Sequence, residues 1–109
     1  MKTGVVVSGL GDATQEHSAA GWEQFGYTPH PGTLNLKVEP HVADWLEQRP
    51  PAVWHTDRLE HMRTFYPASI NGYPCHLRIN HDRTQVEAVA AAHLRSVLGL
   101  DDDDEVALT

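Results

Sequence analysis

The sequence contains a single cysteine, Cys75, in 109 residues. One cysteine can form neither an internal disulfide nor a thiolate metal cluster, so a reducing compartment is the simplest inference. The sequence also lacks any stretch close to the roughly 18 apolar residues that a membrane span needs. Its first residues lack the apolar run of a signal peptide. We therefore expect a cytoplasmic protein with no membrane partner, and we expect Cys75 to pack inside a strand.

Positive charge is scarce as well. Eight Lys and Arg stand against fifteen Asp and Glu, which gives a net charge of −7. A nucleic-acid partner needs a basic surface, so we expect none. Part of the negative charge is local, in the acidic run at residues 101–105. This run is predicted to be a solvated turn, and a small basic patch elsewhere stays compatible with the composition.

What the sequence does contain is typical of one folded β-rich domain over residues 1–109. Apolar residues make up 40% of the chain, and there are seven prolines and eight glycines. This number of turn residues favours a barrel or sandwich of short strands over a helical bundle.

The local patterns predict strands over residues 4–11, 33–38, 63–68, 73–79 and 105–108. The first of these strands leads into a glycine loop. Asn71-Gly72 is the strongest short hairpin signal in the chain. Helical segments are predicted over 15–22, 41–48 and 87–98, and Gly99 is expected to end the last one.

The segment that follows Pro29-His30-Pro31 is the most informative one. Gly32 precedes an alternating strand in which Thr33 and Asn35 share one face and leucines occupy the other. A hydroxyl and a carboxamide side by side offer hard oxygen ligands without added negative charge, as a divalent cation among phosphate oxygens would require. The alternative is the ordinary polar face of a half-buried strand.

Two further segments are candidates for contact with phosphate. A glycine loop follows the first strand, where backbone N–H groups often approach phosphates; it consists of Gly9, Leu10, Gly11, Asp12, Ala13 and Thr14. It is neither a Walker motif nor a complete GxGxxG, and an ordinary β-turn is the alternative. Arg95 is one of the few cations and could meet a phosphate or a ribose, or simply be a solvated helix arginine. The eight histidines lack the spacings of a zinc site.

Read in order, these motifs resemble the archaeal-type, CTP-dependent riboflavin kinases. The resemblance extends over nearly the whole chain and rests on GVVVSGLG at 4–11, FGYTPHPGTLNL at 25–36, YPASING at 66–72, VEAVA at 86–90, Leu94-Arg95 and LDDDDEV at 100–106. The block from Pro31 to Asn35 is the most specific part.

The resemblance implies a compact six-stranded cradle-loop β-barrel, mainly β, with one short helix in the C-terminal half and small helical turns. It implies a kinase that transfers the γ-phosphate of CTP to the ribityl 5′-hydroxyl of riboflavin, giving FMN and CDP with the help of Mg²⁺. Thr33 and Asn35 would bind the metal. The nucleotide would be held by the loop from Gly9 to Thr14 together with Ala92, His93, Leu94 and Arg95.

On the flavin side, the resemblance implies a contact with Glu87 and with a threonine that precedes it. Thr84 is the chemical match for that threonine, and Asn80 fits the position if one residue is deleted. Asn35 and Glu87 are the candidate catalytic residues; Glu87 could orient the ribityl hydroxyl. The family usually has a glycine where this chain has Asp103, which matters if that position needs a positive φ.

A second hypothesis keeps the barrel and a nucleotide or flavin site but without phosphate transfer. A barrel that binds DNA is disfavoured by the acidic charge. For the partners we expect the small molecules riboflavin and CTP, and for the oligomeric state a monomer.

Overall fold

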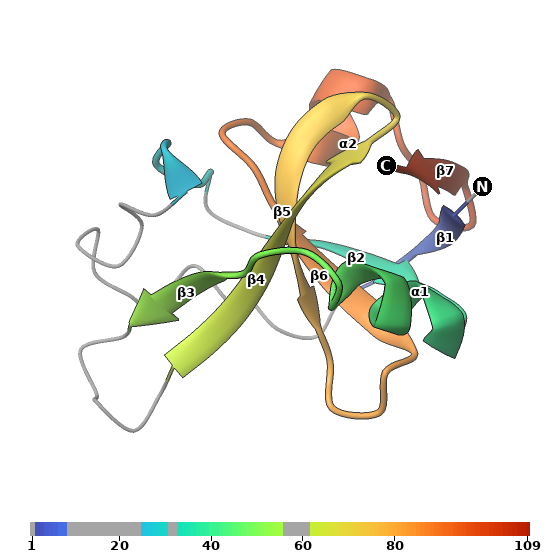
Figure 1. Ribbon diagram of the computed structural model, residues 1–109. Helices are drawn as coiled ribbons and strands as arrows, with labels where there is room; N and C mark the ends of the chain where they lie inside the picture. Colours follow the sequence, from blue (N-terminus) through green and yellow to red (C-terminus); the bar gives the residue numbers. More distant parts are fainter. Residues whose placement is uncertain (1, 9–24, 31–32, 56–61) are drawn as a thin grey trace.

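The computed structural model describes residues 2–8, 25–30, 33–55 and 62–109 (Figure 1). Within these residues the strands are β1 (Lys2–Val7), β2 (Leu34–Lys37), β3 (Ala52–His55), β4 (Met62–Ile70), β5 (Tyr73–Ile79), β6 (Gln85–Val89) and β7 (Glu105–Leu108). The two helices are α1 (Pro40–Leu46) and α2 (Leu94–Leu98). The helix predicted over 15–22 lies outside the described residues.

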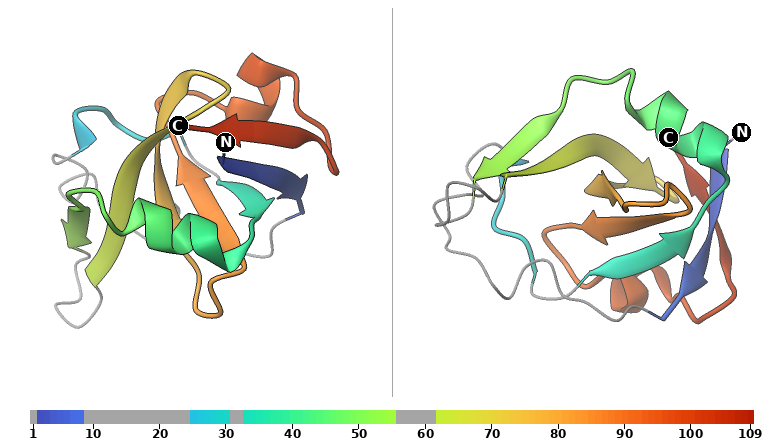
Figure 2. Two further views of the ribbon diagram at one scale, coloured as in Figure 1. Left: turned by 45° about the vertical axis from the view of Figure 1, so that its right-hand side comes forward. Right: turned by 90° about the horizontal axis from the view of Figure 1, so that it is seen from below.

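Six of these strands close into an antiparallel barrel in the order β4-β5-β6-β2-β1-β7. The ring of strands is seen from below in the right-hand view of Figure 2. Closure is made between β4 and β7, where Ile70 pairs with Leu108. Ser69 and Thr109 extend this contact, because each backbone N–H donates to the carbonyl of the other. The mainly-β, six-stranded barrel predicted from the sequence is confirmed.

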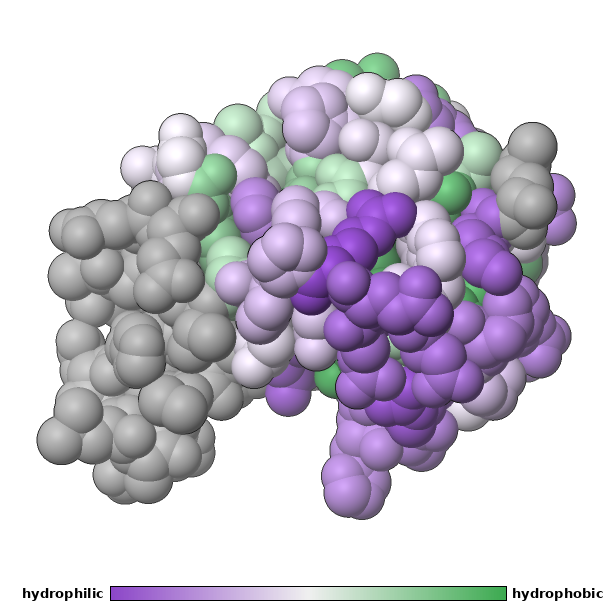
Figure 3. All heavy atoms as spheres, in the orientation of Figure 1, coloured by the Kyte–Doolittle hydropathy of each residue, from purple (hydrophilic) through white to green (hydrophobic). Residues whose placement is uncertain are grey.

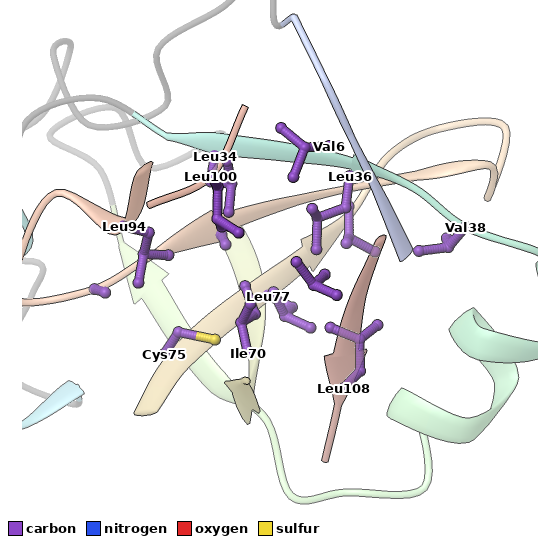
Figure 4. Packing of buried hydrophobic residues seen from close by; sticks show 14 of the residues in the cluster. Val6, Leu34, Leu36, Val38, Ile70, Cys75, Leu77, Leu94, Leu100 and Leu108 are labelled. Carbon is purple, nitrogen blue, oxygen red and sulfur yellow. The ribbon is translucent and has the colours of Figure 1, made fainter. Parts of the chain in front are cut away.

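The barrel interior is filled by the apolar face of each strand. Leu34 and Leu36 of β2 are 4% and 0% exposed, as the alternation predicted, and Lys37 at the end of the strand is exposed. Cys75 is 2% exposed and lies among these side chains (Figure 4). The prediction of a packed strand cysteine is confirmed.

A second, smaller cluster lies beside β3, which pairs with the first half of β4. Its buried members are Phe25, Ala52, Phe65 and Val89, with Tyr27 packed against them. Phe25 and Phe65 meet edge to face with ring centroids 5.1 Å apart. This cluster fixes the chain segment at 25–30 against the outer side of β5 and β6.

The turns agree with the sequence signals. Asn71 and Gly72 have φ values of 49° and 84°, as a two-residue turn between β4 and β5 requires. Gly99 has φ 64° and ends α2 in the left-handed conformation. The helical segment predicted at 41–48 is α1, which packs Val42 and Leu46 into the main core.

One predicted helix is wrong, one strand was missed, and one strand is longer than predicted. The helix predicted over 87–98 is a strand in its first part, β6, and only Leu94–Leu98 is helical. The reason is that β6 has partners on both sides, β2 and β5, and tertiary pairing outweighs a helical spacing of apolar residues. β3 was not predicted, and β4 is longer than the predicted strand over 63–68.

The surface around α1 is polar. In the view of Figure 3, hydrophilic side chains gather over α1 and the turn between β5 and β6. Arg83 in this turn forms ion pairs with Asp44, at 2.6 Å, and with Glu47 of the segment that ends α1. These pairs tie the turn to the helix. In the described part of the chain, no helix is long and apolar enough to cross a membrane.

Candidate functional site

A cavity lies at one end of the barrel, between the start of β2 and the end of β6. Its lining residues are Thr33, Leu34, Ala88, Ala90, Ala92, His93, Leu94 and Arg95. The structure thus brings together residues around Thr33, predicted as a metal ligand, and the segment 92–95, predicted to bind a nucleotide. The two segments lie almost sixty residues apart in the sequence.

Small side chains explain why the cavity exists at this place. Leu34 and Ala88 are directly opposite each other in the pairing of β2 with β6. Ala88 near the end of β6, and Ala90 and Ala92 just beyond it, follow one another at every second position, whereas β6 itself has the larger Val86 two residues before Ala88. Each alanine leaves unfilled the volume that a leucine or valine would occupy, so the core stops short of the barrel end.

Thr33 and Asn35 project side by side, as the strand period predicts. The Asn35 amide nitrogen lies 3.5 Å from the Thr33 hydroxyl oxygen, which is a long hydrogen bond. Asn35 is only 7% exposed even though it is on the outer face of the strand. A rotation of the carboxamide about its last bond would present its oxygen beside that of Thr33. The pair therefore fits the neutral oxygen ligands that a magnesium ion takes in proteins.

Glu87 lies directly opposite Asn35, in the neighbouring strand. The pairing of β2 with β6 makes Asn35 and Glu87 partners, and the pairing of β6 with β5 makes Glu87 and Arg78 partners. Directly opposed residues of antiparallel strands point to the same face of the sheet. The three side chains therefore form one row across β2, β6 and β5.

The carboxylate of Glu87 is mostly buried. Its side chain is 19% exposed, that of Arg78 is 29% exposed, and the nitrogen-to-oxygen distance between them is 3.5 Å. The oxygen in this contact, Oε2, is buried and has no hydrogen-bond partner among the described residues. Because Oε2 is closed off from solvent, a ligand meets Glu87 only at the part of the side chain that stays exposed.

Arg95 is held at the mouth of the cavity by the acidic turn. Its guanidinium donates to Oδ1 of Asp102 at 2.7 Å and to the Val7 carbonyl at 3.4 Å. The other oxygen of Asp102 accepts from the Ser8 hydroxyl at 2.8 Å. These two bonds, that from Arg95 first, lower the pKa of Asp102. Asp102 thus connects Arg95 of α2 with Ser8, the residue just before the predicted glycine loop.

The turn before β7 is solvated as predicted, but it also has a structural role. Val6 donates its backbone N–H to the Asp104 carbonyl, and Asp103 donates to the Val6 carbonyl. Asp103 has φ 72°, so the position where the family usually has glycine does require the left-handed conformation.

His93 faces His30 near the cavity, with the ring centroids 5.3 Å apart. Its Nδ1 lies 2.7 Å from the Ser96 hydroxyl oxygen. The His30 backbone N–H donates to the Ala90 carbonyl at 2.8 Å, which ties His30 to the residue that follows β6. The described part of the chain contains no group of three or more side chains able to hold a metal through His, Cys, Asp or Glu.

Thr84 is not brought to the cavity. It lies in the turn at the other end of β6, about 13 Å along the strand from Ala88. Its hydroxyl donates to Asp82 at 2.6 Å. Asn80 is in the same turn, where its carbonyl oxygen accepts from the backbone N–H groups of Thr84 and Gln85. The assignment of either residue to the flavin stays a prediction.

The predicted loop from Gly9 to Thr14 lies outside the described residues, so its contact with a nucleotide also stays a prediction. Two residues of the site were missed by the sequence reasoning. Arg78 was missed because only the strand register brings it to Glu87. Asp102 was assigned to a solvated run, and the sole signal that could have singled it out is its place in the motif at 100–106.

The fold and the site together define a class: a closed six-stranded antiparallel barrel with a polar row and a cavity where β2 begins and β6 ends. The family model of the CTP-dependent riboflavin kinase domain, described as a domain of unknown function, DUF120, matches residues 6–109. The chain belongs to this family.

Curated relatives agree with this family. A riboflavin kinase of Methanoculleus marisnigri is 32% identical over 95% of this chain and 54% of its own length. One of Pyrobaculum arsenaticum is 34% identical over 94% of this chain and 57% of its own. One of Halobacterium salinarum is 33% identical over 96% of this chain and 54% of its own length. The chain thus spans just over half the length of the curated relatives it matches.

Proposed function

We propose that this chain transfers the γ-phosphate of CTP to the ribityl 5′-hydroxyl of riboflavin, giving FMN and CDP. The family and its riboflavin kinase relatives support the reaction. The observation that carries the proposal is the convergence of Thr33 with the segment 92–95 around one cavity, beside the row that contains Asn35 and Glu87. Phosphoryl transfer requires mainly positioning and charge neutralisation, and this arrangement provides groups for both.

The donor side is assigned to the cavity. Arg95 supplies a cation at its mouth, and the bond to Asp102 restricts where the guanidinium points. His93 and the small side chain of Ala92 line the same space. With the predicted contribution of the loop from Gly9 to Thr14, these residues would bind the cytidine nucleotide. The preference for CTP over other donors follows the family.

Thr33 and Asn35 are the residues that would hold Mg²⁺. Both offer neutral oxygens, and the burial of Asn35 keeps its carboxamide in place. When bound, the ion would neutralise charge on the phosphate oxygens and orient them for displacement.

Glu87 is assigned to the acceptor. Its carboxylate, in a side chain that is 19% exposed, would accept a hydrogen bond from the ribityl hydroxyl and so aim the hydroxyl oxygen at the phosphate. Orientation alone is a sufficient role for this carboxylate, since the loose transition state of phosphoryl transfer needs little base catalysis. Thr84 or Asn80 would contact the flavin from the turn between β5 and β6. We further propose that the protein acts as a cytoplasmic monomer.

The test is an assay for FMN. Purified protein is incubated with riboflavin, Mg²⁺ and either CTP or ATP, and the products are separated by chromatography. We expect FMN with CTP. The double substitution Thr33→Val with Asn35→Leu is expected to lower turnover at least about 100-fold, because the donor phosphates lose their positioning. The control is Thr64→Val, which changes an exposed threonine of β4.

Two outcomes would reject parts of the proposal. Full activity of the folded double variant would remove the metal assignment. Binding of CTP, seen by calorimetry, without FMN from either nucleotide would favour the alternative of a binding module on the same barrel.

A further inference from the structure

The row formed by Asn35, Glu87 and Arg78 contains one residue with no role so far. Arg78 is on β5, and the pairing register puts it directly opposite Glu87. Its position along the strand is therefore fixed by the sheet and not by a flexible loop. An arginine anchored in this way can hold a neighbouring carboxylate in one orientation.

The contact between Arg78 and Glu87 differs from an ordinary surface ion pair. Surface pairs contribute little, because both side chains are free in water. Here both side chains are largely shielded, with 29% and 19% exposed, and the contacting oxygen of Glu87 is fully buried. Arg78 is the cation that the structure provides in contact with it.

Arg78 contacts the carboxylate at Oε2, the oxygen that is closed off from solvent. At 3.5 Å the two atoms attract each other electrostatically, although the contact is too long for a good hydrogen bond. Arg78 thus fixes one oxygen of the carboxylate and leaves the other for the acceptor hydroxyl. It also reduces the attraction of Glu87 for a cation held next to it by Asn35, since a free carboxylate would be the strongest hard ligand nearby.

We propose that Arg78 is a positioning residue, which contacts Oε2 and so orients the Glu87 carboxylate for its other oxygen to accept a hydrogen bond from the acceptor hydroxyl. This inference rests on the proposed function, because it requires an alcohol substrate at Glu87. Arg78 itself does not touch the reacting atoms in this scheme. Its whole effect on turnover passes through Glu87.

The test is a double-mutant cycle made of the wild type, Arg78→Met, Glu87→Gln and the double variant. Met keeps the apolar stem of the arginine and removes its charge. FMN formation with CTP gives kcat and KM for riboflavin, and flavin fluorescence gives the dissociation constant of riboflavin. We expect Arg78→Met to lower kcat/KM for riboflavin on the order of tenfold and to leave the KM for CTP unchanged. In the Glu87→Gln background, Arg78→Met is expected to cause no further loss.

The matched control is Arg49→Met, which removes an arginine that donates to the backbone carbonyls of Pro67 and Thr109, outside the assigned site. It is expected to keep wild-type kinetics. Arg78→Lys restores a cation and is expected to recover part of the activity that Arg78→Met loses. If Arg78→Met does not fold, as judged by circular dichroism, the comparison of Arg78→Lys with Arg78→Gln is made in its place.

The outcomes separate the two proposals. Wild-type protein that forms no FMN overturns the proposed function and this inference with it. Wild-type protein that forms FMN, with unchanged kinetics in Arg78→Met, overturns only the positioning role. So does an equal further loss in the Glu87→Gln background, because a purely structural effect would lower activity whether or not the carboxylate is present.

Discussion

Asn35 is the one buried polar side chain among the residues whose burial is described. A carboxamide has two donor hydrogens and an acceptor oxygen, and the long contact with Thr33 uses little of this capacity. Keeping such a group away from water costs free energy unless a ligand completes its hydrogen bonds or its coordination. The burial of Asn35 is thus a residue-scale sign of function that the sequence pattern, which only placed it on a polar face, did not contain.

His76 is a second residue whose surroundings define its chemistry. Its ring stacks on Phe25 with centroids 4.4 Å apart, and its Nδ1 lies 2.7 Å from the Tyr27 hydroxyl oxygen. The same hydroxyl donates to the Val89 carbonyl at 3.1 Å. Burial raises the pKa of Tyr27 and lowers the pKa of His76, so both groups are neutral in the folded protein at pH 7.

The depressed pKa of His76 predicts a loss of stability in mild acid. The unfolded chain binds a proton on this histidine below about pH 6.5, whereas the folded protein resists it. The stabilisation is therefore complete above about pH 6.5 and decreases as the pH falls below that value towards the folded pKa. His76→Phe keeps the stack on Phe25, and we expect its Tm to fall less between pH 7 and pH 5 than that of the wild type.

Thermal unfolding followed by circular dichroism at several pH values measures this. His41→Gln, at an exposed position of α1, is the control and should retain the wild-type dependence. An equal fall of Tm in His76→Phe and in the wild type would contradict the assignment.

At the scale of elements, the turn from Gly99 to β7 shows where local sequence was informative. Gly99 was expected to end a helix, and it does. The start of that helix was misplaced, because the alanine-rich segment before it has apolar residues at helical spacing but completes its hydrogen bonds as β6 between two strands. The Asn71-Gly72 turn was predictable because a two-residue hairpin turn needs a positive φ at both of its central positions, and Asn-Gly adopts these angles readily.

Asp103 provides a test of the same turn. With φ 72° it adopts a conformation that favours glycine. We expect Asp103→Gly to raise the free energy of unfolding by about 0.5–1 kcal/mol, because relief of the strained backbone exceeds the added entropy of glycine in the unfolded chain. Urea unfolding measures the change.

The control for this prediction is Asp101→Gly, in the same turn but without a positive φ. That substitution should lower stability slightly or leave it unchanged, since it adds only flexibility. An increase of similar size in both variants would show that removal of negative charge, and not backbone conformation, is responsible.

At the scale of the whole molecule, the closed barrel isolates its interior. Cys75 is 2% exposed, and burial raises the pKa of its thiol to about 12. Because the thiolate is the reactive form, a thiol in this state is inert as long as the barrel stays closed. The composition predicted a packed cysteine. The closed barrel adds that neighbouring strands must separate before a reagent can reach Cys75.

Cys75 can therefore report on opening of the barrel. We expect a thiol reagent at pH 8, at low concentration, to label the native protein at a rate proportional to the fraction of molecules that are open, and to label the protein in denaturant at once. Since the chain has one cysteine, the signal needs no correction for other sites. The free energy of opening from labelling should equal that from urea unfolding. Rapid labelling of native protein would contradict the closed core.

The site as a whole was only partly predictable. The segments around Thr33 and Arg95 could be named from their motifs, and the cavity contains both. Their partners Arg78 and Asp102 could not, because they depend on which strands are neighbours and in which register. Such information exists only when the chain is folded.

The row across β2, β6 and β5 also bears on how the barrel avoids wrong pairings. A shift of β6 by one residue would turn Glu87 into the apolar interior and expose Val86 and Ala88. The mispaired sheet would bury an uncompensated carboxylate while losing core contacts, so it is strongly disfavoured. The Glu87 carboxylate, which we assign to substrate binding, thus also favours the native register of β6 over the register shifted by one residue. A glutamate kept for binding therefore also keeps the strand in place.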